Sequence, residues 1–357
     1  MRSTKEAKRL AAAEIAEEIL DDLKSKRNAD HAASKDRSLD HLAGVCSKMK
    51  EVQSRGARNR RAYSDEYKIL YRETDGIVSY FGRYDVGAIT SGMVRDYMLF
   101  LDSRRKAPLA PSSKTKHAMM IRKVLMIALE DGKIDIIPAM PKHRAKDAPR
   151  VSFTDKEYRS LLEAARTCAD RGDKVRGVEI TRERYNLIVF AVHTFLRPTE
   201  TELFGIRFCD IEVEDDPKHL LMTLNGKTGH RKSASLETAV DIFEKQCVMH
   251  AGAKDTDFVF MPEYPNRTTA TNTYRRIFNH SLDEAKLKTD KDGNARSRYS
   301  LRHYALQTRL RKSEGKVNIY WLAENAGTSV EQLERFYLKR MEPKGERVRN
   351  IQSFGDR

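Results

Sequence analysis

The sequence predicts a mainly helical protein with one small β-hairpin or three-stranded sheet, an α+β chain divided by a basic, proline-rich segment. Apolar residues recur at helical spacing through most of the chain, and strand-like runs are confined to residues 207–213, 218–224 and 231–236. Between the two parts, Pro138, Pro141 and Pro149 prevent a continuous helix. We therefore expect residues 138–151 to link two domains.

Composition and charge favour a nucleic-acid partner. The chain has 357 residues, of which 39% are hydrophobic, enough for real cores. It carries 67 Lys and Arg against 52 Asp and Glu, a net charge of +15, which is typical of proteins that bind polyanions. The alternative is a basic protein that binds none.

Cysteine usage and hydropathy exclude several other classes. The four cysteines form no CxxC pair, so they predict neither a zinc site nor a disulfide framework; they are Cys46, Cys168, Cys209 and Cys247. No apolar run is long enough to cross a membrane, and no apolar segment of a signal peptide is present at the start. We expect a cytoplasmic protein with no membrane partner and no bound metal.

Two helical regions precede the linker. Residues 1–62 form a basic segment with an amphipathic helical pattern near its start. Residues 63–137 are predicted to be a bundle of three helices, the first capped by Ser64 and ended by Gly82. The last is opened by Ser113, and its predicted buried face consists of Met120, Val124, Ile127 and Ala128.

Clustered cations on the bundle and in the linker are candidates for contacts with DNA phosphates. They are Arg104, Arg105, Lys106, Lys114, Lys116, Arg122 and Lys123 on the bundle, with Lys142, Arg144 and Lys146 in the linker. The alternative for each single residue is a solvated helix face.

A second domain is predicted over residues 152–340, with Thr154 capping its first helix, and residues 341–357 form a polar tail.

Arg197 is the first candidate site residue of this domain. It precedes Pro198, which is tolerated in the first turn of a helix, so Arg197 is expected at a helix N-terminus that suits an anion. The alternative is an ion pair with Glu200 or Glu202.

Lys227 is the next candidate, within Gly-Lys-Thr-Gly at 226–229 between two strand-like runs. A nucleotide-binding P-loop needs a glycine at position 221 and a following helix, whereas Leu221 and strands are present, so we reject ATP binding. A lysine in a hairpin can reach a leaving oxygen, although most such lysines have no catalytic part.

Arg302 and Tyr337 complete the set. Ser300 is predicted to cap a helix that carries Arg302 in its first turn, where the helix dipole adds to its charge. Tyr337 is predicted to lie in a helix opened by Ser329, with Gln332 completing a capping box. The alternative is a core tyrosine on that helix.

The order Arg197, Lys227, Arg302, Tyr337 resembles the tyrosine recombinases, the phage-integrase family, over about residues 63–340. The resemblance implies a helical core-binding domain and a catalytic domain that clamp double-stranded DNA. It implies that Tyr337 attacks a phosphate to form a 3′-phosphotyrosyl link, while Arg197 and Arg302 stabilise the developing charge. Lys227 would protonate the leaving 5′-oxygen, and no cofactor or metal would be required.

The sequence departs from the family pattern at two places. Members often have histidine where this chain has Tyr299, and histidine or tryptophan where it has Thr328. Both replacements keep a hydroxyl donor but cannot titrate near neutral pH as histidine does. We include Tyr299, Thr328 and the adjacent His303 among the candidate site residues.

The resemblance implies a site-specific recombinase or integrase that integrates or excises a mobile element. It implies a tetramer on paired sites, and an accessory DNA-bending protein is a further partner that it allows. Two alternatives stay open: relaxation of DNA, as by a type IB topoisomerase, and a recombinase-derived regulator that binds DNA without cutting it.

Overall fold

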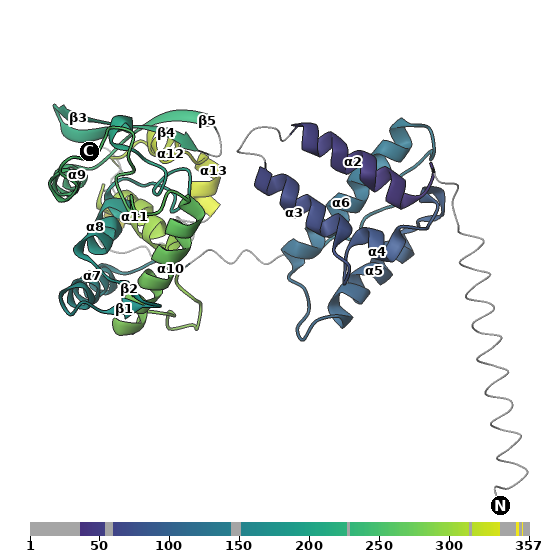
Figure 1. Cartoon of the computed structure of the whole chain (residues 1–357), viewed down its shortest axis with the longest axis horizontal. Helices are drawn as coiled ribbons and strands as arrows, with labels where there is room; N and C mark the ends of the chain where they lie inside the picture. Colours follow the sequence, from purple (N-terminus) through teal and green to yellow (C-terminus); the bar gives the residue numbers. More distant parts are fainter. Residues whose placement is uncertain are drawn as a thin grey trace, which may run out of the picture. The chain divides into compact units, whose positions relative to one another are not determined.

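The computed structural model describes residues 36–53, 60–143, 151–226, 229–313 and 316–335, together with 348, 349 and 352. The chain divides into two compact units, Met1–Asp147 and Ala148–Arg357, called unit 1 and unit 2 below (Figure 1). Several predicted features lie outside the described residues: the helix expected near the start of the chain, and the candidate site residues Lys227, Tyr337, Arg144 and Lys146.

Unit 1 is a helical bundle. Its elements are α2 (Leu39–Gln53), α3 (Arg60–Tyr71), α4 (Ile77–Phe81), the 3-10 helix η1 (Val86–Ala88), α5 (Ser91–Ser103) and α6 (Pro111–Glu130). The predicted buried face of α6, from Met120 to Ala128, lies in the core and is confirmed. Leu39 and Leu42 of α2 are fully buried in the same core, so the bundle begins upstream of residue 63.

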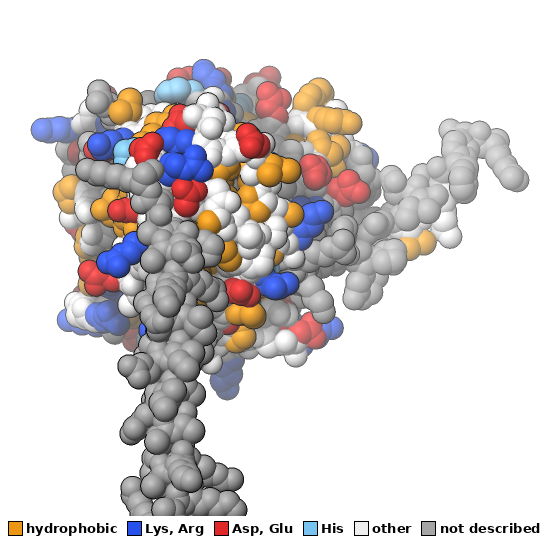
Figure 2. Space-filling model, turned by 90° about the vertical axis from the view of Figure 1, so that its right-hand side faces the viewer, with side chains coloured by type: hydrophobic (Ala, Val, Ile, Leu, Met, Phe, Trp, Pro, Cys, Tyr) orange, Lys and Arg blue, Asp and Glu red, His pale blue; other side chains and the backbone are white. Residues whose placement is uncertain are grey.

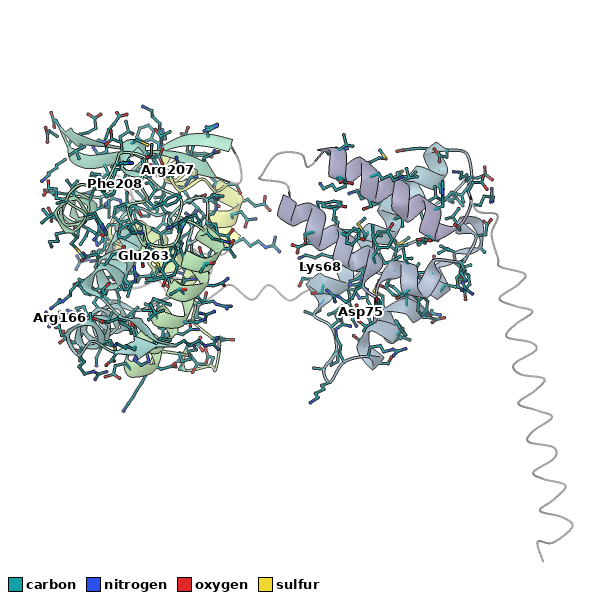
Figure 3. All side chains as sticks on the ribbon, viewed as in Figure 1. Lys68, Asp75, Arg166, Arg207, Phe208 and Glu263 are labelled. Atoms are coloured by element: carbon teal, nitrogen blue, oxygen red, sulfur yellow. The ribbon has the colours of Figure 1, made fainter. Side chains whose placement is uncertain are left out.

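The helix predicted from Ser64 to Gly82 is two helices. α3 begins at Arg60, so Ser64 lies inside it and is not its cap. The chain then turns at Gly76, where an added Cβ would lie 2.5 Å from the carbonyl oxygen of Arg72. The hydroxyl of Tyr97 donates to the Asp75 carbonyl at 2.8 Å and anchors this turn. Asp75 is labelled in Figure 3.

Helix α6 also begins earlier than predicted. Pro111 occupies its first turn, two residues before Ser113. A proline is well suited to that place, because its missing N–H would have no partner within the helix.

Unit 2 combines helices with two small antiparallel sheets. Its helices are α7 (Asp155–Asp170), α8 (Arg182–His193), η2 (Phe208–Asp210), α9 (Thr238–Met249), α10 (Arg267–Glu284), α11 (Tyr299–Lys312), α12 (Ile319–Ala326) and α13 (Val330–Leu333). Its strands are β1 (Lys174–Val175), β2 (Val178–Glu179), β3 (Ile211–Asp215), β4 (Lys218–Gly226) and β5 (Gly229–Ala234).

The larger sheet has the order β3-β4-β5 and lies at one end of unit 2, next to α9 and α12 (Figure 1). Its β4–β5 register pairs Leu221 with Ala234 and Gly226 with Gly229. The Gly-Lys-Thr segment therefore joins two strands, as predicted, and strands flank it where a P-loop would have a helix. Leu220, Met222 and Leu224 alternate into the core.

The first strand is shorter than predicted. Residues 208–210 form the 3-10 helix η2, because the Asp210 carboxylate accepts a hydrogen bond from the Arg207 backbone N–H at 2.9 Å. Arg207 and Phe208 are labelled in Figure 3. The β1–β2 hairpin was not predicted, since two-residue strands are too short to show an alternating pattern.

Two features of unit 2 position the site. Thr154 and Glu157 form a full capping box at the start of α7, which confirms that cap. Helix α8 is buried along nearly its whole length and leads directly to residues 195–197.

In the described ranges, no helix has the length and apolarity needed to cross a membrane.

Candidate active site

Arg302 is held on α11 by two backbone carbonyls. Its side chain is buried, and its guanidinium donates from Nη1 to the oxygen of Phe195 and from Nη2 to the oxygen of Ala326 at 2.7 Å. The helix begins at Tyr299 and not after Ser300, whose hydroxyl instead accepts from the Ser297 N–H at 3.1 Å. Arg302 lies in the first turn of α11 all the same.

Phe195 presents its carbonyl from a strained backbone. Its φ is 58°, a left-handed conformation that side chains other than glycine rarely adopt. The residue is 3% exposed, so burial in the core of unit 2 maintains the strain. Such outliers concentrate at functional sites, and this one directs a carbonyl toward Arg302.

Arg197 does not begin a helix, contrary to the prediction. Residues 200–205 form turns, and the Glu202 carboxylate takes the place of a helix cap. Glu202 accepts from the Arg197 backbone N–H at 3.0 Å and from its Nη1 at 2.5 Å. The alternative pairing of Arg197 with Glu202 is thus correct. Arg197 Nη2 also donates to the Gly327 oxygen.

The two arginines meet at the end of α12. Gly327 caps this helix with φ 62° and ψ 46°, the left-handed conformation that glycine adopts without strain. Ala326 and Gly327 offer consecutive carbonyls, and Arg302 binds the first while Arg197 binds the second. Since the last carbonyls of a helix have no partner within it, the arginines satisfy them and are fixed in turn.

Arg231 is a third arginine at this place, which the sequence reasoning missed. It lies on β5, its side chain is 13% exposed, and it donates to Glu202 at 3.3 and 3.1 Å. Its guanidinium packs against the backbone of Gly327, where an added Cβ would lie 2.7 Å from the guanidinium carbon. Alternation along β5 places it on the same face as the buried Ser233, the one sequence signal that could have found it.

The electrostatics of the cluster favour an anion. Burial alone would raise the pKa of Glu202, but hydrogen bonds from Arg231 and from the Arg197 backbone lower it below its ordinary value, so the group is ionised. Three arginines (Arg197, Arg231 and Arg302) against one carboxylate leave a net charge of +2, from 3 − 1. Fixed guanidinium groups of this kind suit a phosphate, which offers several acceptor oxygens.

The other predicted site residues take these places. Tyr299 is the first residue of α11 and Thr328 follows Gly327 directly; both are half-buried. His303 is buried on α11 beside Arg302. Ser329 caps α13 as predicted, with its hydroxyl accepting from the Gln332 N–H at 3.2 Å; the structure gives this helix the cap and not the full capping box.

Several predicted DNA contacts of unit 1 already have acidic partners. Arg105 pairs with Asp75, Lys114 with Asp102 and Lys123 with Glu66. The others in the described part are exposed, namely Arg104, Lys106, Lys116, Arg122 and Lys142. On the face shown in Figure 2, cations are interleaved with acidic and hydrophobic side chains.

One cluster of unit 2 has metal-ligand residue types, formed by Cys168, Asp173 and His280. Arg171 already supplies a cation there: its guanidinium donates to both carboxylate oxygens of Asp173, at 2.7 and 3.2 Å, and to Glu284 at 2.8 Å. Burial also raises the pKa of the Cys168 thiol to about 11, which disfavours the thiolate that a metal needs. We interpret the cluster as an ion-pair network.

Comparison with known proteins identifies the fold. No protein-family model and no curated relative matches the sequence. Among solved structures, a lambda integrase dimer bound to a core site matches 90% of this chain and 83% of its own, with a TM-score of 0.62 and 15% identity.

Two further structures agree. A Tn1549 transposon integrase in complex with transposon right-end DNA matches 88% of this chain and 98% of its own, with a TM-score of 0.57 and 15% identity. XerH recombinase bound to its difH substrate in a pre-cleavage complex matches 88% and 84%, with a TM-score of 0.51 and 12% identity. The chain therefore has the fold of the tyrosine recombinases, the fold that its ordered arginines and tyrosine predicted.

Proposed function

We propose that this chain is a site-specific recombinase that cuts and rejoins DNA through a covalent link to Tyr337. The observation that supports this most directly is the convergence of Arg197 and Arg302 on the consecutive carbonyls of Ala326 and Gly327. These residues are far apart in sequence; the turn on which they meet precedes α13, and Tyr337 follows α13 in the sequence.

In the proposed reaction, the positive charge of the clustered arginines acts on the scissile phosphate. The Tyr337 oxygen bonds to phosphorus as its proton passes to solvent, the bond to the 5′-oxygen breaks, and Lys227 gives a proton to that leaving oxygen. Arg197 and Arg302 stabilise the charge on the nonbridging oxygens. The phosphotyrosyl link conserves the energy of the broken bond, so rejoining needs no ATP.

Partners follow from the same proposal. Lambda integrase and XerH were solved on DNA, and lambda integrase also as a tetramer on a Holliday junction. We propose that this chain binds double-stranded DNA through the exposed cations of unit 1 and forms tetramers on paired sites. Tyr299, Thr328 and His303 are proposed to line the phosphate site, and a mobile element is the proposed genetic context.

The test uses duplexes from the DNA that flanks the gene, first selected for binding. A nicked version of the selected duplex should trap the protein at a 3′ end, because the short 5′ fragment diffuses away. Binding without an adduct would instead indicate the non-cutting regulator. Relaxation of supercoiled DNA that lacks the selected sequence would indicate a topoisomerase.

A further inference from the structure

Arg231 contacts two parts of the candidate site, and its own strand follows a third in the sequence. It donates two hydrogen bonds to Glu202, packs on the backbone of Gly327, and stands on β5, the strand that directly follows Lys227 in sequence. Within the described residues its Nε–H is buried and makes no hydrogen bond. A buried N–H group without a hydrogen-bond partner reduces the stability of the folded protein, so Arg231 is poorly suited to a purely structural role.

Strand β5 also fixes the turn on which Arg197 and Arg302 meet. The Ser233 hydroxyl donates to the Asn325 oxygen at 2.9 Å. The Asn325 side-chain amide then pairs with Ala234, accepting from its N–H at 2.6 Å and donating to its carbonyl at 3.0 Å. The Asn325 amide thus continues the hydrogen-bond pattern of β5, and these bonds fix the end of α12 against the edge of that strand.

The charges of the cluster give Arg231 a second effect. Glu202 is almost fully buried and lies between two guanidinium groups, accepting from Arg197 on one side and from Arg231 on the other. If Arg197 alone faced this carboxylate, the pair would be neutral and would attract a phosphate weakly. With Arg231 sharing the carboxylate, the group of three retains a net charge of +1, from 2 − 1.

We propose that Arg231 is a positioning residue for cleavage: it shares Glu202 with Arg197, which leaves positive charge for the phosphate, and its guanidinium packs on the backbone of Gly327, whose carbonyl accepts from Arg197. This inference rests on the proposed function. It adds a residue that acts through Arg197 and Gly327 without touching the reacting atoms.

The experiment measures the rate of covalent adduct formation by the full chain on the nicked, selected duplex at saturating protein. Arg231→Ala should slow this rate about 10-fold or more, while site binding stays within about threefold of the wild type. In a Glu202→Gln background the same change should cost less than about threefold, because no carboxylate is left to neutralise Arg197. Lys218→Ala, which removes a half-buried cation paired with Glu244 at the far end of the same sheet, is the matched control and should keep the wild-type rate.

Equal slowing by Arg231→Ala in both backgrounds would overturn the proposal, because the effect would then not pass through Glu202. Arg231→Gln loses the charge but keeps a hydrogen-bond donor for Glu202, and it decides the matter if Arg231→Ala does not fold. A slower adduct with unchanged binding is expected, because Glu202 then neutralises Arg197, and a wild-type rate would refute the role. No adduct from the wild type would instead refute the proposed function itself.

Discussion

Glu202 is expected to be the residue of the cluster whose loss destabilises unit 2 most. It accepts four hydrogen bonds, at 2.5, 3.0, 3.1 and 3.3 Å, from Arg197 and Arg231, and only 1% of its side chain is exposed. Replacing it with alanine leaves two guanidinium groups without their carboxylate. Their side chains are 19% and 13% exposed, so solvent can recover little of the loss.

Breaking one buried ion pair by removing a partner costs about 3–5 kcal/mol, and we expect Glu202→Ala to fall in that range. Glu202→Gln keeps the shape and one acceptor oxygen, so it should cost about 1–3 kcal/mol. Glu212→Ala, which removes an exposed carboxylate from β3, is the matched control and should change stability by less than about 0.5 kcal/mol.

The assay is urea unfolding of the full chain combined with hydrogen–deuterium exchange of individual peptides. Peptides from α8 and β4 should lose protection in Glu202→Ala at lower urea, whereas peptides from α6 in unit 1 should not change. If Glu202→Ala and Glu212→Ala gave the same midpoint for unit 2, the reasoning that the carboxylate holds the arginines in place would be wrong.

Three further predictions follow from the site and from unit 1. Arg302→Ala should slow adduct formation about 10²-fold or more. It should also destabilise unit 2, since the buried Phe195 and Ala326 carbonyls lose their donor. Adduct formation by this variant above one tenth of the wild-type rate would contradict the predicted role of Arg302. Lys227→Ala should be rescued by a substrate with sulfur at the 5′-bridging position, because a thiolate leaves without a proton, and failure of the rescue would remove Lys227 from the role of acid. Burial lowers the pKa of His117 from 6.5 to about 4, so the unfolded chain binds the proton at a higher pH than the folded chain does. The free energy of unfolding of unit 1 should therefore decrease as the pH falls from 6.5 to about 4, by up to about 3 kcal/mol. Urea titrations that showed no change over this pH range would refute the assignment.

Features set by neighbouring residues could be predicted from the sequence. The buried face of α6, the Thr154 cap and the Ser329 cap depend on residues within a few positions of each other, and all are present, although Gln332 does not complete the predicted capping box. The helix break at Gly76 could not be predicted, because it depends on the close approach of the Arg72 carbonyl and on Tyr97, which belongs to another helix.

The candidate site shows the same division. The sequence order made Arg197 and Arg302 candidates, and the structure brings them together at the end of α12. The sequence placed Arg197 at a helix start and left the ion pair with Glu202 as an alternative, because a local pattern does not show which carboxylate caps a backbone N–H. Arg231 reaches Glu202 across 29 residues, and Arg197 reaches Gly327 across 130. Contacts over such separations arise only once β5 and α12 pack together, so no local pattern announces them.

The most direct test of the proposed function is to identify the residue that becomes joined to DNA. Adduct formed on the nicked, selected duplex is digested with protease, and the peptide carrying the nucleotide is sequenced by mass spectrometry. Attachment at Tyr337, with no adduct from a Tyr337→Phe variant that still binds the duplex, is the predicted result. Attachment at another residue, or an adduct formed by Tyr337→Phe, would contradict it.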